Sequence, residues 1–365
     1  MKRIISLFIL GFSITAMGFA QTDLQPVAIV SLTRSEPITV RQLRTQCEVL
    51  AWQNLVPQLV RIPTTAEISG FVQQLNRDQR RQILDVMINE RLALQAAERD
   101  RITVTENELN QHISPLRAQL AQMLGRPATE EEFAQQVRNE FGMDLPAFRE
   151  NLRRQLITRK YLMFKKEDLI NSIRPPTEAE IVREFNISRS ELVQPDTVRI
   201  HMIQVPYGPD TASRNRARDL TQRLSNEIGT DPARFDAVAL RAQTPNSGFQ
   251  ANDIGYVPFN AQARMAMGQD FLDVAFNLRQ GEVSRTIEGQ QGFQIIKVTE
   301  NHSMKHLGLD DLILDNSGMT VRQFLTQVMS AQREQEIFAR AQQELVIELR
   351  AGNPFQIMEN NLSGW

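Results

Sequence analysis

The stretch Thr197–Val205, TVRIHMIQV, is predicted to form a β-strand. The fold expected for the central part of the chain is inferred from this strand. Successive side chains of a strand point to opposite faces of the sheet. His201 and Met202 are therefore expected on different faces, and a shift of one residue in register would exchange them. The imidazole of His201 titrates near neutral pH. The register of the strand therefore determines on which face of the sheet this group lies.

The sequence around this strand predicts a mixed α/β unit. Upstream, the prolines of Arg174-Pro175-Pro176 end a long helix, since proline lacks a backbone donor and disfavours helical geometry in the residue before it. Downstream, the predicted order is a helix over residues 213–228, a loop, a helix near 271–278 and a closing strand over 293–298. The whole unit has about 100 residues, a common domain size.

The chain before residue 175 is predicted to be mainly helical. In residues 78–100, apolar side chains such as Leu84, Ile88 and Leu92 recur at helical spacing. The run VAIV at residues 27–30 indicates a short strand. Capping boxes, in which a threonine is followed three residues later by Glu or Gln, mark the helix starts. They begin at Thr39, Thr105, Thr129 and Thr177.

The C-terminal part is predicted to be one long helix followed by a strand. Another capping pattern, Thr320-x-x-Gln323, opens the helix, which continues to about Arg350. Its apolar stripe is too large to remain in water, so we expect it to pack on the N-terminal helices and not on the α/β unit before it. Residues 355–358, FQIM, are expected to pair near VAIV. The stripe consists of Phe324, Val328, Ile337, Phe338, Ala341, Leu345 and Leu349.

The N-terminus has the features of an export signal. Residues 1–20 combine Lys2 and Arg3, a short apolar run and a small-x-small end, as in a cleavable signal peptide. No later stretch reaches the ~20 apolar residues of a membrane-spanning helix, so we expect no integral membrane segment in the mature chain. The single Cys47 lies far from the cleavage point, which argues against a lipoprotein. We therefore expect a periplasmic protein.

Charge and histidine spacing argue against several classes of partner. A formal net charge of -2 gives no general attraction to nucleic acid. His112, His302 and His306 show no pairing with Cys47 or with a carboxylate cluster at metal-ligand spacing. We expect no nucleic-acid partner, no metal and no other cofactor. The basic residues between 149 and 166 are interpreted as a solvated helix face, with client or membrane contact as the alternative.

Several segments resemble the SurA family of periplasmic chaperones and the related PrsA foldases. VAIVSLTRSEPITVRQL is similar to the family's opening strand, turn and helix, and FGMDLPAFRENLRRQLITRKYL to its long helices. The turn DIGY (253–256), the run 271–284 and GFQIIKV (292–298) resemble a parvulin-type prolyl isomerase domain. The resemblance implies an α+β multidomain fold. A mainly helical N-terminal domain would be completed by the C-terminal helix, with one inserted parvulin-like α/β domain that has a four-stranded antiparallel sheet and helices.

The resemblance also sets the expected domain boundaries. A signal peptide (1–20) precedes a SurA-like helical domain (21–175) and a connecting helix or linker (176–195). A parvulin-like domain (196–301) and a second linker (302–318) follow. A C-terminal helix and strand (319–365) would pack on the N-terminal domain.

The resemblance further implies where a substrate would bind. In parvulins an apolar floor seats a proline ring, and two histidines with a Cys or Asp form a polar network behind it. The floor is retained here, but Met202 and Gln294 stand at the two histidine positions. Since glutamine does not titrate near neutral pH, isomerase activity is expected to be weak or absent. The candidate catalytic residues are His201, Gln294 and Thr244, and the expected substrate-binding residues are Met202, Ile254, Met267, Phe271 and Gln294.

These features predict a folding chaperone or holdase for unfolded outer-membrane or secreted proteins. It would bind their proline- and aromatic-containing segments through many weak contacts. One alternative is an active peptidyl-prolyl isomerase that uses Gln294 and a His201 brought to the site by a shifted register. Another is an envelope scaffold or dedicated binding protein that uses the fold for a single partner.

Overall fold

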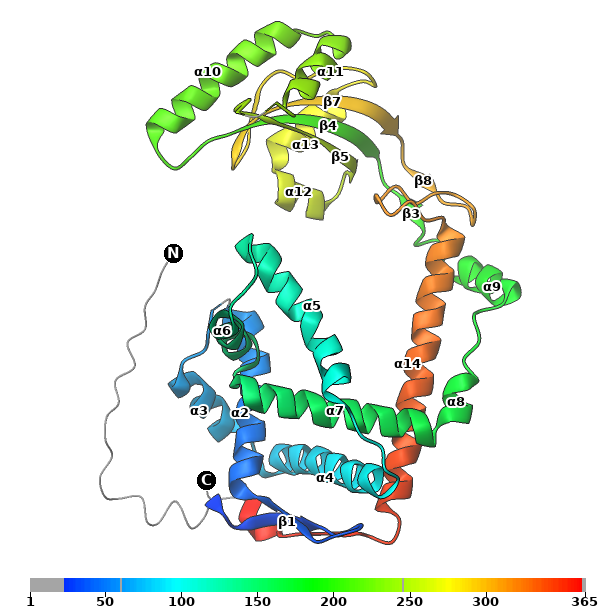
Figure 1. Cartoon of the computed structure of the whole chain (residues 1–365). Coiled ribbons are helices and arrows are strands. Elements are labelled where there is room, and N and C mark those ends of the chain that lie inside the picture. Colours follow the sequence, from blue (N-terminus) through cyan, green and yellow to red (C-terminus); the bar gives the residue numbers. More distant parts are fainter. Residues whose placement is uncertain (1–22, 60, 245, 363–365) are drawn as a thin grey trace. The chain divides into compact units, whose positions relative to one another are not determined.

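The computed structural model describes residues 23–59, 61–244 and 246–362, which divide into two units (Figure 1). The first unit contains the chain up to Ile173 and again from Gln335, and the second contains Arg174–Glu334. The expected signal peptide, residues 1–20, lies outside the described residues. The finer domain boundaries given above stay a prediction.

The first unit is mainly helical, as the expected fold class requires. A small sheet in the order β2-β1-β9 accompanies the helices, and Ala28 lies opposite Ile357 in antiparallel register. The predicted pairing of the C-terminal strand with VAIV is therefore confirmed. Its strands are β1 (Pro26–Val30), β2 (Glu36–Thr39) and β9 (Phe355–Ile357), followed by the 3-10 helix η1 (Glu359–Leu362). Its helices are α2 (Val40–Leu59), α3 (Thr65–Gln74), α4 (Arg77–Arg99), α5 (Glu106–Leu124), α6 (Glu130–Phe141), α7 (Leu145–Lys165), α8 (Glu167–Asn171) and the second part of α14 (Val321–Arg350).

Capping boxes fix the helix starts in both units. Each box satisfies two backbone donors that have no partner inside the helix. At α9 (Glu178–Ser188), the hydrogen bonds from the backbone N–H and the hydroxyl of Thr177 lower the pKa of Glu180 to about 2, and Arg333 adds to this effect. The five predicted boxes, at Thr39, Thr105, Thr129, Thr177 and Thr320, are confirmed, and the sequence analysis missed two more, at Thr64 and Asn76.

The C-terminal helix completes the core of the first unit. Leu345 and Leu349 of α14 are buried in the same cluster as Leu84, Ile88 and Leu92 of α4. This confirms that the helix packs on the N-terminal domain. Within the described residues, no helix combines the length and the apolar composition that crossing a bilayer requires.

The first part of α14 packs differently from the prediction. Val321 and Leu325 are buried with Ile181 of α9 and with Leu307, inside the second unit. Phe324, which the sequence analysis assigned to the covered stripe, is 38% exposed. The prediction is wrong here because a helix of 30 residues is long enough to contribute to two cores. Helical periodicity alone does not separate the two contributions.

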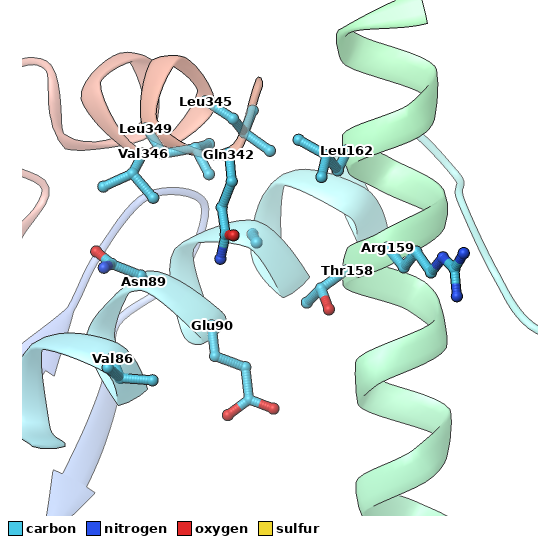
Figure 2. A pocket seen from close by; sticks show the side chains of 11 residues that line it. Val86, Asn89, Glu90, Thr158, Arg159, Leu162, Gln342, Leu345, Val346 and Leu349 are labelled. Atoms are coloured by element: carbon cyan, nitrogen blue, oxygen red, sulfur yellow. The ribbon is translucent and has the colours of Figure 1, made fainter. Parts of the chain in front are cut away.

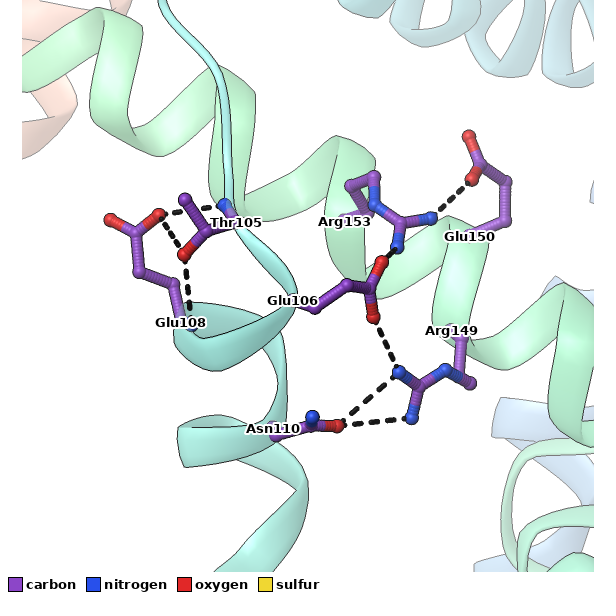
Figure 3. A network of polar contacts seen from close by, with 7 residues as sticks. All are labelled: Thr105, Glu106, Glu108, Asn110, Arg149, Glu150 and Arg153. Carbon is purple, nitrogen blue, oxygen red and sulfur yellow. Dashed lines mark hydrogen bonds and ion pairs between the residues drawn. The ribbon is translucent and has the colours of Figure 1, made fainter.

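The basic residues of α7 make contacts between helices. Arg149 donates to Glu106 (2.8 Å) and to Asn110 (3.2 Å) of α5, and Arg153 pairs with Glu106 and Glu150 (Figure 3). Exposed ion pairs of this kind each contribute little stability, but they neutralise the arginines locally. Arg154 and Lys160 pair with Glu90 and Glu108 in the same way.

The second unit is built on a four-stranded antiparallel sheet in the order β5-β4-β7-β6. Helices α10 and α11 cover one face of this sheet, and α12 and α13 cover the other (Figure 1). This is the parvulin-like arrangement that was expected. The strands are β4 (Thr197–Pro206), β5 (Gln250–Pro258), β6 (Ile287–Glu288) and β7 (Gly292–His302), and the helices are α10 (Thr211–Ile228), α11 (Pro232–Arg241), α12 (Ala261–Met267) and α13 (Gln269–Asn277). A separate ladder joins β3 (Val193–Gln194) to β8 (Lys305–His306).

Candidate functional site

Four of the five residues expected to bind substrate form one apolar cluster on the α12–α13 face. Met202 and Phe271 are buried there, at 9% and 3% exposure, and Ile254 and Met267 pack against them while remaining partly exposed. Strand β4 brings Met202 to this face because Ile200, two residues before it, belongs to the same cluster. Met267 and Ile254 are therefore the parts of this cluster that remain partly accessible to solvent.

Gln294 occupies the same face of the sheet. It lies two residues before Ile296, which is buried in the Met202 cluster, and it faces Ile287 across the β6–β7 pair. Its side-chain Oε1 is buried and has no hydrogen-bond partner among the described residues. A buried amide oxygen without a donor is costly, and such groups call for an explanation. A peptide N–H or a water molecule at this position would satisfy it.

His201 lies on the opposite face, the one that α10 and α11 cover. Its neighbours Ile200 and Met202 both belong to the α12–α13 cluster, so the residue between them points away from it. The His201 Nε2 is 3.6 Å from Oδ2 of Asp253, and the side chain is 39% exposed. Arg199, on the same face, donates to Asp253 (2.9 Å) and to Glu300 (3.1 Å). His201 therefore stands beside a network of ion pairs.

This network keeps its carboxyl groups ionised. Partial burial alone would raise the pKa of Asp253, but hydrogen bonds from Arg199 and from the Gly255 N–H bring it below its usual value. The hydrogen bond with His302 lowers the pKa of Glu300, and Arg199 adds to this against the effect of burial. The two carboxylates in turn raise the pKa of Arg199. The charged groups of the sheet are thus concentrated away from Met202.

The third candidate catalytic residue, Thr244, is exposed in the turn that follows α11, where its N–H donates to the carbonyl of Arg241. The Met202 face thus offers apolar side chains together with neutral amides, since Gln204 lies opposite Gln294 and Asn252 lies opposite Met202. Proline isomerisation has a barrier of about 18–20 kcal/mol, which comes from the partial double bond of the amide. An amide can donate to or accept from the peptide, but it does not share protons near neutral pH as imidazoles do.

The first unit contains a second candidate site, which the sequence analysis missed. A groove of about 350 Å³ lies between α4, α7 and α14 (Figure 2). Leu162, Leu345, Val346 and Leu349 form an apolar wall, and Val86 stands at the rim with 64% exposure. The groove joins helices that are far apart in the sequence, so periodicity predicts their apolar faces but not the space left between them.

A few polar groups interrupt the apolar wall of this groove. In Figure 2, the Gln342 side chain extends from α14 toward Asn89 and Glu90 of α4. Glu90 is paired with Arg154 at 3.2 Å, and Asn89 accepts from Arg350 at 2.7 Å. These groups are therefore satisfied internally. An apolar concavity with few polar groups suits a hydrophobic segment better than a charged ligand.

Two protein-family models match this chain, one in each unit. Residues 1–162 match the SurA-like N-terminal domain, and residues 201–300 match the PPIC-type PPIase domain. The chain thus contains a SurA-like N-terminal domain followed by a PPIC-type PPIase domain. Two independent matches in this order agree with the fold described above, because they fall on the helical unit and on the four-stranded sheet.

The curated proteins to which this chain is similar include proteins named as chaperones and as a foldase. It is 28% identical over 234 residues to the chaperone SurA of Saccharophagus degradans, a match that covers 60% of this chain and 48% of that protein. The chain thus spans about half the length of the SurA proteins it matches. It is 23% identical over 303 residues to the foldase protein PrsA of Clostridium acetobutylicum, covering 81% of this chain and 83% of that protein.

Solved structures of SurA-like proteins are also similar. One comes from a study of PEB4 and Cj1289, described as SurA-like chaperones of Campylobacter jejuni. It shares 13% identity, with a TM-score of 0.38, and the match covers 92% of this chain and 100% of that one.

Proposed function

We propose that this protein is a periplasmic chaperone that holds unfolded exported proteins, including outer-membrane proteins, and that its parvulin-like domain binds proline-containing segments with weak or no isomerase activity. The observation that carries the proposal is the apolar groove between α4, α7 and α14 in the SurA-like unit. The signal-peptide features of residues 1–20 support export. The names of the SurA and PrsA relatives support a role in folding.

The groove is suited to weak and repeated contacts. A volume of about 350 Å³ is at the lower end of the range for ligand pockets and accommodates one or two large side chains at a time. Burial of apolar surface is not directional, so such a wall accepts many sequences. Affinity for a long unfolded chain would then come from many modest contacts, which also allow release without ATP.

The test uses an unfolded β-barrel client whose aggregation is followed by light scattering, without ATP. The wild-type chain at severalfold molar excess should suppress aggregation, and Val86→Asp should weaken suppression because it places a charge at the rim of the groove. The matched control is Ile347→Asp on α14. Its exposure, 63%, is within one percentage point of that of Val86 at 64%, but it does not line the groove. No suppression by the wild type, or equal loss in both variants, would contradict the proposal.

A second candidate function is prolyl isomerisation through Gln294. It is favoured by one observation: the Oε1 of Gln294, which has no hydrogen-bond partner among the described residues, lies on the same face as Met202 and Phe271. A proline tetrapeptide assay tests it. Catalysis by the wild type that falls in both Gln294→Ala and Phe271→Leu would establish this function, whereas an inert wild type would remove it.

A further inference from the structure

Strand β5 forms an edge of the four-stranded sheet. Among the described residues its only strand neighbour is β4, and the side chains of Gln250, Asn252 and Asp253 are exposed. An edge strand presents backbone N–H and C=O groups that another extended chain can pair with. Natural proteins usually cover or interrupt such an edge. In this protein a side chain from another loop covers part of the edge.

Asn316 occupies the place that a peptide group of a fifth strand would take. Its Oδ1 accepts from the Tyr256 N–H at 2.6 Å, and its Nδ2 donates to the Tyr256 carbonyl at 3.2 Å. One side-chain amide thus forms both bonds that a paired strand residue would form. The close approach requires glycine at 255, because a Cβ there would lie 2.1 Å from Asn316 Oδ1. The edge is capped at one residue.

A tight loop presents this side chain. Asn316 has a φ of 69° and Gly318 a φ of 70°, both left-handed, and the Asp315 carboxylate accepts from the Ser317 N–H at 3.0 Å. The loop is closed by an antiparallel bridge between Leu312 and Thr320. A hollow of about 400 Å³ lies between the loop and β5. Its lining includes Arg199, Asp253, Ile254, Tyr256, Leu312 and Asn316.

We propose that the β5 edge and this hollow bind an extended polypeptide segment, which displaces the Asn316 side chain and adds as a fifth strand. The hydrogen-bonding geometry at Tyr256 is that of main-chain pairing. The charges in the hollow belong to Arg199 and Asp253, which already pair with each other at 2.9 Å. The protein therefore recognises mainly the backbone of the bound peptide, and Ile254 and Leu312 provide apolar contacts. Such a site tolerates many peptide sequences.

This site is separate from the groove of the first unit and shares only Ile254 with the Met202 cluster, so its test does not depend on either proposed function. The probe is a fluorescent nine-residue peptide of alternating Thr and Val, measured by anisotropy with the full chain. Two further peptides carry N-methyl groups on every second residue. One is methylated at the odd-numbered residues and the other at the even-numbered residues. Since only one edge of a strand pairs with β5, one of these peptides should lose binding and the other should keep it.

The variant Asn316→Gly removes the competing amide while glycine keeps the left-handed backbone. It should bind the unmodified peptide about tenfold more tightly, since two hydrogen bonds no longer compete. Asn316→Asp keeps the acceptor for the Tyr256 N–H and should give a smaller gain. The matched control is Asn353→Gly, which changes another left-handed asparagine, at φ 53°, in the first unit. It should leave the affinity unchanged.

Hydrogen exchange locates the bound peptide. Binding should slow exchange in residues 250–257 and leave α12 and α13 unchanged. Four results would overturn the inference: no binding by the wild type and by Asn316→Gly, equal binding of both methylated peptides, slowed exchange at residues 261–277 in place of β5, or dimerisation of Asn316→Gly without peptide. The last result would assign the edge to a second copy of the chain.

Discussion

The two faces of the four-stranded sheet differ in where they hold polar groups. The α10–α11 face has an apolar core around Phe235 and carries charged groups beside it, with Arg199 at the centre of two ion pairs. The α12–α13 face has an apolar core around Phe271 and uncharged amides beside it, among them Gln294, whose Oε1 has no hydrogen-bond partner among the described residues. Strand β4 thus carries a histidine and an arginine, and neither side chain lies on the Met202 face. The sheet thus separates the apolar Met202 cluster from the ion pairs of Arg199.

The largest expected effect is the loss of either aromatic core residue. Phe271 and Phe235 are 3% and 1% exposed, so replacing either by alanine should lower the free energy of unfolding by about 3–5 kcal/mol through lost burial and a cavity. Hydrogen exchange of β4 and β7 measures this. The two variants should lower the free energy of unfolding by the same amount.

The milder pair Phe271→Leu and Phe235→Leu keeps the fold and separates stability from binding. Only Phe271→Leu should weaken binding of a proline-containing peptide. If Phe235→Leu weakened binding equally, the assignment of the Met202 face as the binding face would be wrong.

The second prediction concerns the bulge that shapes the charged face. Gly255 has a φ of 79° and pairs with Ile200, while Asp253 pairs with His201, so one extra residue lies between them. This lets Asp253 and Tyr256, three residues apart, both contact Arg199. Gly255→Ala should cost at least ~1–2 kcal/mol, because alanine is strained in this conformation and its Cβ meets Asn316.

A double-mutant cycle separates the two causes of this effect. In an Asn316→Gly background the contact is gone, so Gly255→Ala should cost less, and the remainder is backbone strain. Equal costs in both backgrounds, measured by hydrogen exchange of β5, would show that Asn316 does not press on this strand.

The third prediction is a pH dependence of the charged face. The pKa values of Asp253 and Glu300 lie below their ordinary values of 3.8 and 4.5. Their ion pairs therefore stabilise the fold above about pH 4.5, and this stability is lost as pH falls through the lowered pKa values. Arg199→Met should reduce stability at pH 7 and flatten its decrease below pH 4.5. Urea unfolding at several pH values measures the slope.

The control for this prediction is Arg218→Met. Arg218 lies over the Phe293 ring, on the same face, at 5.6 Å, and no ion pair of it is found among the described residues. It should leave the acid slope unchanged. An identical flattening in both variants would mean that loss of any positive charge, and not the Arg199 ion pairs, controls the slope.

Local signals in the sequence predicted much of this fold. Threonine with Glu or Gln three residues later marked five helix starts, because the two side chains satisfy the same backbone donors wherever the helix packs. The missed box at Asn76 has the same chemistry with asparagine and glutamine. Strand alternation likewise separates His201 from Met202 from the sequence alone, since the period of a strand is fixed.

Features that depend on packing between distant segments were not predictable. The segment DIGY was predicted to be a turn, but it lies inside β5, where the bulge depends on pairing with β4. The amide contact of Asn316 joins residues 60 positions apart. The division of α14 between two cores, and the groove beside its second part, depend on where other helices place their side chains. Periodicity identifies an apolar face but not its partner.

The smallest expected effect is that of His201. Its side chain is 39% exposed and 3.6 Å from Asp253, on the face away from Met202. A partly exposed pair of this kind contributes little to stability, so His201→Ala should change unfolding and proline-peptide binding hardly at all. Gln294→Ala is the matched comparison, because it alters an amide with a buried oxygen on the Met202 face. If His201→Ala abolished peptide binding or isomerisation while Gln294→Ala did not, the histidine would reach the substrate through another register of β4, and the separation of the two faces would fail.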